Sequence, residues 1–311
     1  MPMDTIIEAG AEQPAAAGST PDLEQQILTE SGFYWRERDS VKVLVCRPLE
    51  AVGFENGFST RLGGVTDISS EKPVAEALPG SSLGGTDLNL AGFNEDSREN
   101  IYENRRRFFA VFDHPFKLGT AWQVHSDNIR TVETENDLGD SDERADALVS
   151  SLDGVMLGIK TADCVPILIG DISTGAFAAV HAGWRGTAQS IVKKTVAKLG
   201  DIYGSKPADL ICAIGPAAGC NRYEVGKDVI DIFSQNFAEG RKYFIETRLD
   251  HALVDLKQAN EDQLASLGVG RENIYTAPFC TMERVDLFFS YRIEKTKYGR
   301  TGRLLSVIGR L

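Results

Sequence analysis

Basic residues, cysteine and histidine are all scarce in this sequence. Its 311 residues include 33 Lys and Arg against 45 Asp and Glu, so the formal net charge is −12. Because such an acidic chain repels phosphate backbones and anionic lipid, neither nucleic acid nor a membrane is expected to be a partner. No apolar run reaches the ~18 residues that a transmembrane helix needs. The first basic residue is Arg36, so the N-terminus does not resemble a secretory or transit peptide, and we expect a cytoplasmic protein.

Cysteine occurs only five times and histidine only four times. The cysteines are odd in number, widely separated and never arranged as CxxC. This pattern argues against a disulfide framework, a zinc ribbon and thioredoxin-like chemistry. Because histidine is so rare, each one in an unusual local context is informative.

The chain is 42% hydrophobic, which is enough for a sizeable core. Residues 1 to about 22 contain Ala, Gly and Pro without a hydrophobic period, and we expect 1–33 to be a disordered or weakly ordered tail. Residues 34–311 are expected to form a single catalytic domain. Prolines, glycines and serines in 66–86 predict a surface loop.

Short apolar runs and helical periods mix along this domain. The apolar runs predict strands at 41–46, 52–59, 155–159, 165–169, 176–181, 209–214, 242–246, 273–277 and 287–291. Helical spacing predicts helices at 95–112, 187–199, 226–237 and 255–267. Because strands and helices do not alternate strictly, the pattern predicts an α+β fold with mixed sheets rather than a doubly wound one.

Three segments place polar residues at the ends of predicted strands, namely WQVH, TADCVP and VHAGWRG. A catalytic zinc commonly has three His or Cys ligands and one open position, and His125, Cys164 and His181 could supply that set. These residues are far apart in the sequence, so no local loop enforces the site. Spacing alone therefore favours the alternative, in which both histidines are hydrogen-bonded core residues and Cys164 is a small buried hydrophobe.

Further polar residues near glycines or strand ends are candidates for substrate binding. Gly183 permits close approach of a ligand and Arg185 could bind an anion, although a tight turn with a paired arginine is equally consistent. Arg61 has the same two interpretations, with a solvated arginine favoured. Asp163 could orient a His ligand or move protons, or it could cap a turn. Arg292 could reach a pocket, although the segment FFSYR is more simply explained as part of the aromatic core.

Taken in order, a series of segments resembles the laccase-domain family, also called the multicopper polyphenol oxidase, purine nucleoside phosphorylase or peptidoglycan-editing-factor family. The resemblance extends from about residue 50 to 310. The matching segments are FSTRLGG (58–64), DLNLAGFNED (87–96), ENRRRF (103–108), WQVH (122–125), ADALVS (145–150), TADCVPILIGD (161–171), AAVHAGWRGT (178–187), AIGP (213–216), YEVG (223–226), CT (280–281) and FFSYR (288–292).

The resemblance implies a zinc centre formed by His125, Cys164 and His181, in which copper could replace zinc. It implies a single domain of the layered α/β/β/α kind. The implied activities are phosphorolysis of adenosine, inosine and methylthioadenosine, and deamination of adenosine. Two departures are Ser126, where the family usually has Gly, and Ile293, where it often has a second Arg.

We therefore expect a zinc-dependent purine nucleoside enzyme, a monomer or weak homodimer that takes a purine nucleoside and phosphate. Catalysis is assigned to the three ligands and Asp163. Arg61 and Arg185 would hold the phosphate through bidentate hydrogen bonds. Trp184 or Phe58 would stack on the base. The full set of expected substrate-binding residues is Arg61, Asn89, Gly183, Trp184, Arg185 and Arg292.

The alternative is a cysteine amidase or hydrolase that acts on a cell-wall precursor. Cys164 would be the nucleophile, His125 or His181 the base, and N–H groups near Gly183 the oxyanion hole. A copper polyphenol oxidase is not expected, because its copper sites need around ten histidines and this chain has four. Polar residues at buried strand ends also argue against a non-catalytic binding module.

Overall fold

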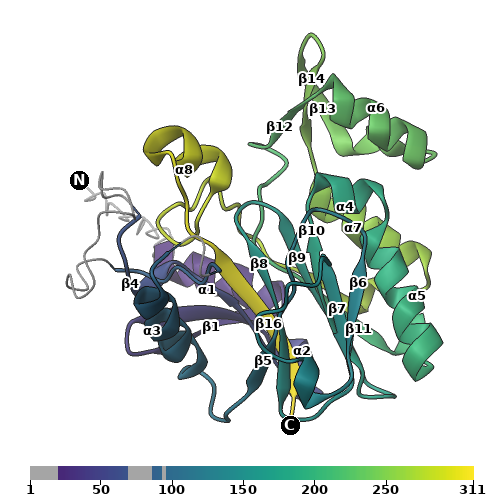
Figure 1. Cartoon of the computed structure of the whole chain (residues 1–311). Coiled ribbons are helices and arrows are strands. Elements are labelled where there is room, and N and C mark those ends of the chain that lie inside the picture. Colours follow the sequence, from purple (N-terminus) through teal and green to yellow (C-terminus); the bar gives the residue numbers. More distant parts are fainter. Residues whose placement is uncertain (1–19, 69–85, 93–95) are drawn as a thin grey trace, which may run out of the picture.

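The computed structural model of the chain describes residues 20–68, 86–92 and 96–311, and two six-stranded sheets form its centre (Figure 1). The first sheet has the strand order β1-β2-β3-β16-β8-β5. The second has the order β15-β11-β9-β10-β7-β6. In these orders the strands are β1 (Phe33–Arg38), β2 (Val41–Cys46), β3 (Phe54–Ser59), β16 (Leu304–Arg310), β8 (Val155–Thr161), β5 (Lys117–Gly119), then β15 (Ile274–Thr276), β11 (Leu210–Ile214), β9 (Val165–Asp171), β10 (Phe177–Ala182), β7 (Ala147–Ser150) and β6 (Ile129–Val132).

Helices cover both outer faces of the paired sheets (Figure 1). Phe108 of α3 (Arg98–Phe109) packs on the first sheet. On the second sheet lie α5 (Ile191–Tyr203) and α7 (Leu256–Ser266), with Val192 and Leu264 in the core beneath them. Both sheets are mixed, because β5–β8, β6–β7 and β11–β15 are parallel pairs among antiparallel ones. The fold thus has the mixed sheets that the sequence pattern predicts and the layered α/β/β/α arrangement that the family resemblance implies.

The central strands are buried on both faces, and their side chains alternate between two cores. In β9, Val165, Ile167 and Ile169 face the helices, whereas Leu168 faces the first sheet. In β10, Val180 likewise belongs to the helix side. This period of two means that odd and even positions at a strand end point to opposite sides. It decides which polar residues meet where these strands end.

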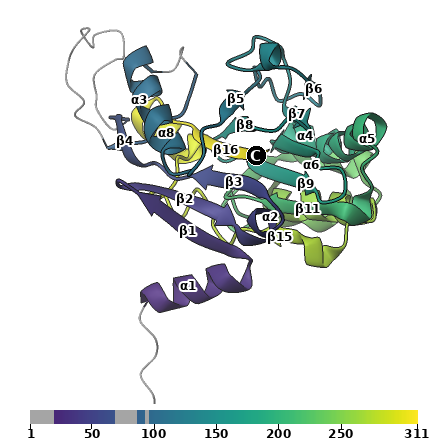
Figure 2. The same cartoon turned by 90° about the horizontal axis from the view of Figure 1, so that it is seen from below.

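An N-terminal helix precedes the first strand. α1 (Thr20–Glu30) lies against β1 at the edge of the first sheet (Figure 2), and its Leu28 is fully buried in the core between the sheets. Glu24 accepts a hydrogen bond from Trp35 Nε1 at 3.0 Å. Packed structure therefore begins before residue 34, where we expected the domain to start. Residues 1–19 of the expected tail lie outside the described residues.

Two predicted elements are wrong. The single helix expected at 187–199 is two helices, α4 (Trp184–Ala188) and α5, because Ser190 has a left-handed φ of 60° that breaks the turn between them. The strand expected at 287–291 is a turn followed by α8 (Tyr291–Tyr298). Ser290 caps α8 by accepting a hydrogen bond from the Ile293 N–H. Because the helix starts there, the aromatic pair before it, Phe288 and Phe289, is buried in the core but does not belong to a sheet.

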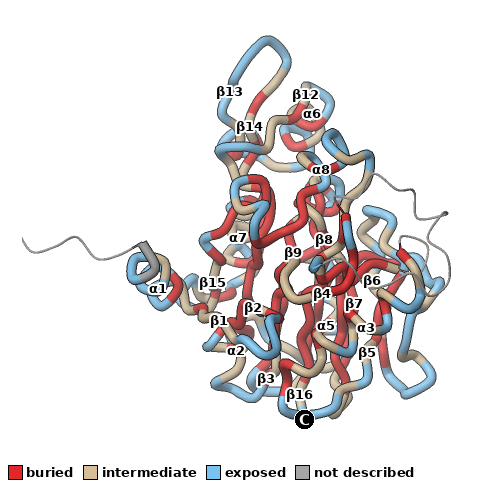
Figure 3. Tube along the Cα trace, turned by 90° about the vertical axis from the view of Figure 1, so that its left-hand side faces the viewer, coloured by how far each residue is buried: buried red, intermediate tan, exposed pale blue. Residues whose placement is uncertain are grey.

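A small third sheet stands apart from the central pair, in the order β12-β14-β13 (Figure 3). Its strands are β12 (Glu224–Gly226), β14 (His251–Val254) and β13 (Phe244–Arg248), and α6 (Lys227–Asn236) packs beside them. The remaining α-helix and strand are α2 (Arg47–Ala51) and β4 (Leu62–Thr66). Most of the predicted 66–86 loop, residues 69–85, lies outside the described residues. None of the helices within the described ranges combines the length and the apolar character needed to cross a membrane.

Candidate metal centre

Strand register brings His181 next to Asp146. β7 and β10 are antiparallel, and Val180 pairs with Ala147, so the next pair along is His181 with Asp146. The His181 N–H donates to the Asp146 carbonyl oxygen at 2.7 Å. Because side chains alternate along a strand, both residues point away from the helices and toward the first sheet.

The same register logic places Cys164 against Gly183. β9 and β10 are antiparallel, and Ala182 pairs with Val165, so Gly183 comes opposite Cys164. A Cβ atom at Gly183 would lie 2.9 Å from Cys164 Sγ and 3.2 Å from His125 Cδ2. Only glycine therefore fits here without moving two of the three candidate ligands.

His125 lies on a loop that two hydrogen bonds of the Gln123 side chain attach to Lys160. The Gln123 side chain donates to the Lys160 carbonyl oxygen and accepts from the Lys160 N–H, both at 2.7 Å. His125 itself has a left-handed φ of 59°. Such a conformation costs a non-glycine residue about 1–3 kcal/mol and persists only where the surroundings enforce it. Strain at a candidate ligand is consistent with a functional constraint.

Asp146 connects both histidines. Its fully buried carboxylate accepts from His181 Nδ1 at 2.8 Å and from the His125 N–H at 2.9 Å. It also accepts from Ser126 N at 2.6 Å and from Ser126 Oγ at 2.8 Å. Burial raises the pKa of Asp146, but the His181 and Ser126 contacts outweigh it and lower the pKa to about 2. With its Nδ1–H directed at this carboxylate, His181 keeps Nε2 as the ring nitrogen that binds a metal once its proton is displaced.

The three candidate ligands converge. The ligand atoms of His125, Cys164 and His181 all lie within 4.8 Å of one another. Cys164 Sγ is 3.9 Å from His125 Nε2, close to the ~3.6 Å expected for a tetrahedral zinc with ordinary Zn–S and Zn–N bonds. Two nitrogens and one thiolate leave a fourth position open, so the donor set fits a catalytic zinc. Among the described residues this is the only such group of three or more potential ligands.

Electrostatics favour the thiolate. Burial raises the pKa of Cys164, but the neighbouring His181 and His125 outweigh it and lower the pKa to about 6. Burial conversely disfavours protonated His181, but Cys164 and Asp146 outweigh it and raise its pKa to about 9. A thiolate at neutral pH is the form of cysteine that binds metal or acts as a nucleophile.

Asp163 does not contact either histidine. Its carboxylate accepts from Thr281 Oγ1 at 2.7 Å, from Ser290 Oγ at 3.0 Å and from the Arg292 N–H at 2.7 Å. Of the roles that the sequence left open for Asp163, orienting a candidate His ligand falls instead to Asp146. Asp163 instead joins the Cys164 loop to the start of α8.

Three residues assigned to substrate binding are engaged elsewhere in the fold. Arg61 is paired with Asp87 at 2.8 Å and with Glu294 at 2.7 Å, so its charge is already neutralised. Asn89 is fully buried, donates to Asp96 and accepts from the Arg303 N–H. Phe58, expected to stack on the base, is 1% exposed in the core between the sheets.

Two of the expected residues remain accessible. Arg185 is exposed, and its Cζ lies 4.3 Å from the centre of the Trp184 ring, which is half-buried. It forms no ion pair with the described part of the chain, so the alternative of an arginine paired in a tight turn does not apply. Arg292 is also exposed, and its Cζ lies 4.9 Å from the centre of the Tyr223 ring.

Sequence reasoning missed Asp146 and Tyr223. Both lie in segments that carry the family resemblance, ADALVS and YEVG, and that was the available signal. An aspartate or a tyrosine can be assigned to a functional site only when its neighbours in space are known. The strand register supplies that knowledge for Asp146, and the packing of α8 supplies it for Tyr223.

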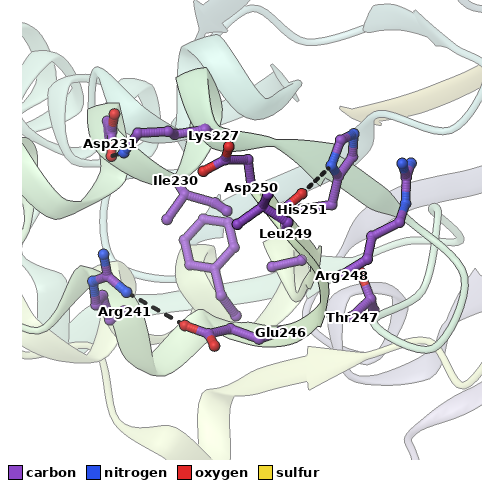
Figure 4. Close-up of a pocket in the computed structure, with 12 residues that line it drawn as sticks. Lys227, Ile230, Asp231, Arg241, Glu246, Thr247, Arg248, Leu249, Asp250 and His251 are labelled. Atoms are coloured by element: carbon purple, nitrogen blue, oxygen red, sulfur yellow. Dashed lines mark hydrogen bonds and ion pairs between the residues drawn. The ribbon is translucent and has the colours of Figure 1, made fainter.

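A hollow of about 450 Å³ lies elsewhere, between α6 and the β13–β14 hairpin (Figure 4). Its charged lining is largely paired internally: Lys227 with Asp231 at 3.0 Å and Arg241 with Glu246 at 3.5 Å. None of the three candidate ligands lines it. Chemistry rather than size therefore places the candidate site at the convergence of His125, Cys164 and His181.

Comparison with known proteins gives one consistent result. Residues 55–310 match the family model described as multi-copper polyphenol oxidoreductase laccase. The chain is 34% identical over 250 residues to purine nucleoside phosphorylase YfiH of Escherichia coli, covering 80% of this chain and 91% of that protein. It is 37% identical over 276 residues to purine nucleoside phosphorylase SA1030 of Staphylococcus aureus, covering 86% and 95%.

Solved structures agree with the sequence comparison. The crystal structure of YlmD from Geobacillus stearothermophilus superposes with a TM-score of 0.77 and 32% identity, covering 90% of this chain and 98% of that one. The Bacillus licheniformis hypothetical protein YfiH superposes with the same TM-score and 27% identity, covering 90% and 99%. The similarity thus extends over nearly the whole of both neighbours.

Proposed function

Because the chain belongs to the multi-copper polyphenol oxidoreductase laccase family, we propose that it is a zinc-dependent purine nucleoside phosphorylase. The observation that carries the proposal is the convergence of His125, Cys164 and His181 around one point, with Asp146 holding both histidines. The substrates we propose are inosine, adenosine and methylthioadenosine, together with orthophosphate. Deamination of adenosine is proposed as a second activity of the same site.

Zinc is the metal we assign to this donor set. When bound by His125, Cys164 and His181, zinc would supply a Lewis acid that withdraws charge from a bound substrate. A single copper ion could occupy the same donors. A multicopper centre could not, because the chain has four histidines and such a centre needs around ten.

The chain's own residues provide orientation and fixed charge. Asp146 holds the Nδ1–H of His181 and the backbone N–H of His125, so it fixes the His181 ring and the loop that carries His125. In phosphorolysis, a phosphate oxygen forms a bond to C1′ of the ribose while the C1′–N9 bond breaks. The electron pair of that bond stays with the purine, which then takes up a proton. In deamination, water adds at C6 of adenine and ammonia leaves.

The alternative, a cysteine amidase acting on a cell-wall precursor, has one observation in its favour. The pKa of Cys164 is lowered to about 6 with two imidazoles beside it, as in cysteine hydrolases. The two functions differ in their response to metal. A zinc enzyme loses activity when the metal is removed, whereas zinc on the nucleophilic sulfur would inhibit an amidase.

Metal analysis combined with nucleoside turnover tests the proposal. Purified protein with one zinc per chain should release hypoxanthine and ribose 1-phosphate from inosine only when phosphate is present. Removal of zinc with a chelator should abolish the activity, and added zinc should restore it. No turnover of inosine, adenosine or methylthioadenosine at one zinc per chain would contradict the proposed function.

A further inference from the structure

Tyr223 and Arg292 form a stacked pair next to the Cys164 loop. The Arg292 Cζ lies 4.9 Å from the centre of the Tyr223 ring, within the range of a cation–π contact. Tyr223 is largely buried against Ala218 and Met282. Burial, and after it the nearby Cys164 charge, raise the pKa of Tyr223 to about 12, so the phenol keeps its proton at neutral pH.

Asp163 fixes this pair relative to the metal centre. It precedes Cys164 in the chain, and its carboxylate accepts from the Arg292 N–H at 2.7 Å. Its carbonyl oxygen accepts from the Ala218 N–H at 2.9 Å, which ties the loop that leads to Tyr223 to the same point. Both members of the stacked pair are thus held to the residue beside the thiolate ligand.

The guanidinium of Arg292 has N–H donors available for a ligand. Its Nη1 donates to the carbonyl oxygen of Glu224 at 2.9 Å and the guanidinium also hydrogen-bonds to the Tyr223 side chain, but no carboxylate of the described residues forms an ion pair with it. Arg61, by contrast, is neutralised by Asp87 and Glu294. An exposed guanidinium that is already stacked on a ring loses little freedom when it binds an oxyanion.

We propose that Arg292, stacked on Tyr223 and positioned by Asp163, binds the orthophosphate co-substrate beside the metal centre. The inference rests on the proposed function and names its anion site. It gives Arg292 the role that sequence reasoning gave to Arg61 together with Arg185. Fork-shaped donors of arginine match two phosphate oxygens, and one charge-assisted contact of this kind contributes strongly to affinity.

The test compares two exposed arginines. Arg292→Gln removes the proposed phosphate ligand, whereas Arg222→Gln removes an equal charge from the exposed residue that precedes Tyr223. Both variants are loaded with zinc, and orthophosphate alone is titrated into each by calorimetry. Arg292→Gln should weaken phosphate binding about 10- to 100-fold, the size of a lost charge-assisted contact. Arg222→Gln should change it by less than about twofold, because a surface charge acts only through screened solvent.

Steady-state kinetics separate binding from a general structural effect. Arg292→Gln should raise the KM for phosphate and leave the KM for inosine near the wild-type value. Asp163→Asn should raise the KM for phosphate as well while the protein still holds one zinc per chain. An unchanged phosphate affinity in Arg292→Gln, or an equal loss in Arg222→Gln, would overturn the inference.

The inference and the proposed function fail in different ways. If the wild type phosphorolyses inosine but Arg292→Gln keeps the wild-type KM for phosphate, only the inference is wrong. If phosphate binds through Arg292 but no nucleoside is cleaved, the anion site stands and the proposed function falls. If the zinc-loaded wild type does not bind phosphate, the inference is wrong whatever else the protein does.

Discussion

Asp146 accepts a hydrogen bond of 2.8 Å from Nδ1 of His181, its neighbour across the β7–β10 pair. The same carboxylate accepts from the backbone N–H of His125 at 2.9 Å. One buried side chain therefore orients two of the three candidate ligands. The registers of the β7–β10 and β9–β10 pairs, together with the His125 loop, bring the centre together.

Replacing Asp146 by Asn should weaken zinc binding. The amide cannot accept all the bonds that the carboxylate accepts, so the His181 ring and the His125 loop lose their orientation. Loss of such an outer partner typically costs about 10- to 100-fold in metal affinity. Competition with a chromogenic chelator measures the change. Asp163→Asn is the matched control, a buried carboxylate beside Cys164 that contacts neither histidine, and equal losses in the two variants would contradict the assignment.

Replacing Gly183 by Ala should disturb the centre directly. The new Cβ would lie 2.9 Å from Cys164 Sγ and 3.2 Å from His125 Cδ2, closer than carbon and sulfur atoms normally approach. Zinc content and phosphorolysis should fall together, while the circular dichroism spectrum stays that of the wild type. Gly200→Ala, on α5, is the control and should retain both. Full zinc occupancy in Gly183→Ala would show that the site tolerates the displacement.

Cys164 in the metal-free protein should react with iodoacetamide far below the pH at which an ordinary thiol reacts. Its pKa is lowered to about 6, so the thiolate predominates above that pH and disappears as the pH falls through it. The alkylation rate, followed by mass spectrometry, should therefore rise with pH and reach half its plateau near pH 6. Cys212 serves as an internal control, because burial raises its pKa well above the usual value. A half-plateau near pH 9 for Cys164 would contradict this electrostatic account.

Replacing Arg61 by Gln should affect stability rather than phosphate binding. The change leaves Asp87 and Glu294 without their shared cation, and the Glu294 side chain is only 2% exposed. Breaking a buried pair in this way costs about 3–5 kcal/mol of unfolding free energy. Urea denaturation measures the loss, and the KM for phosphate should stay near the wild-type value. Arg248→Gln, which removes the partner of the surface residue Glu224, should leave stability almost unchanged.

Sequence patterns predicted an α+β fold with mixed sheets, whereas the layered arrangement and the three converging residues came from the family resemblance. The strands of the second sheet are buried on both faces, so their apolar runs are continuous and easily recognised. His125, Cys164 and His181 stood out because histidine is rare and because ordered segments resembled a family. Their spacing alone would have favoured ordinary core residues.

The errors share a physical cause, which is that partners distant in the sequence decide a side chain's role. Asp146 was missed because its role depends on the register of two strands. The ion pair of Arg61 with Glu294 could not be predicted, because nothing near Arg61 in the sequence shows that the two residues meet. Phe288 and Phe289 were read as a strand because they are apolar, whereas the Ser290 cap starts a helix directly after them.

X-ray absorption at the zinc edge tests the central claim most directly. The protein should hold one zinc per chain, with one sulfur ligand at about 2.3 Å and two imidazole nitrogens at about 2.0–2.1 Å. In Cys164→Ser the sulfur contribution should disappear. A zinc shell without sulfur in the wild type, or a sulfur contribution that survives in Cys164→Ser, would contradict the assignment of His125, Cys164 and His181 as the metal ligands.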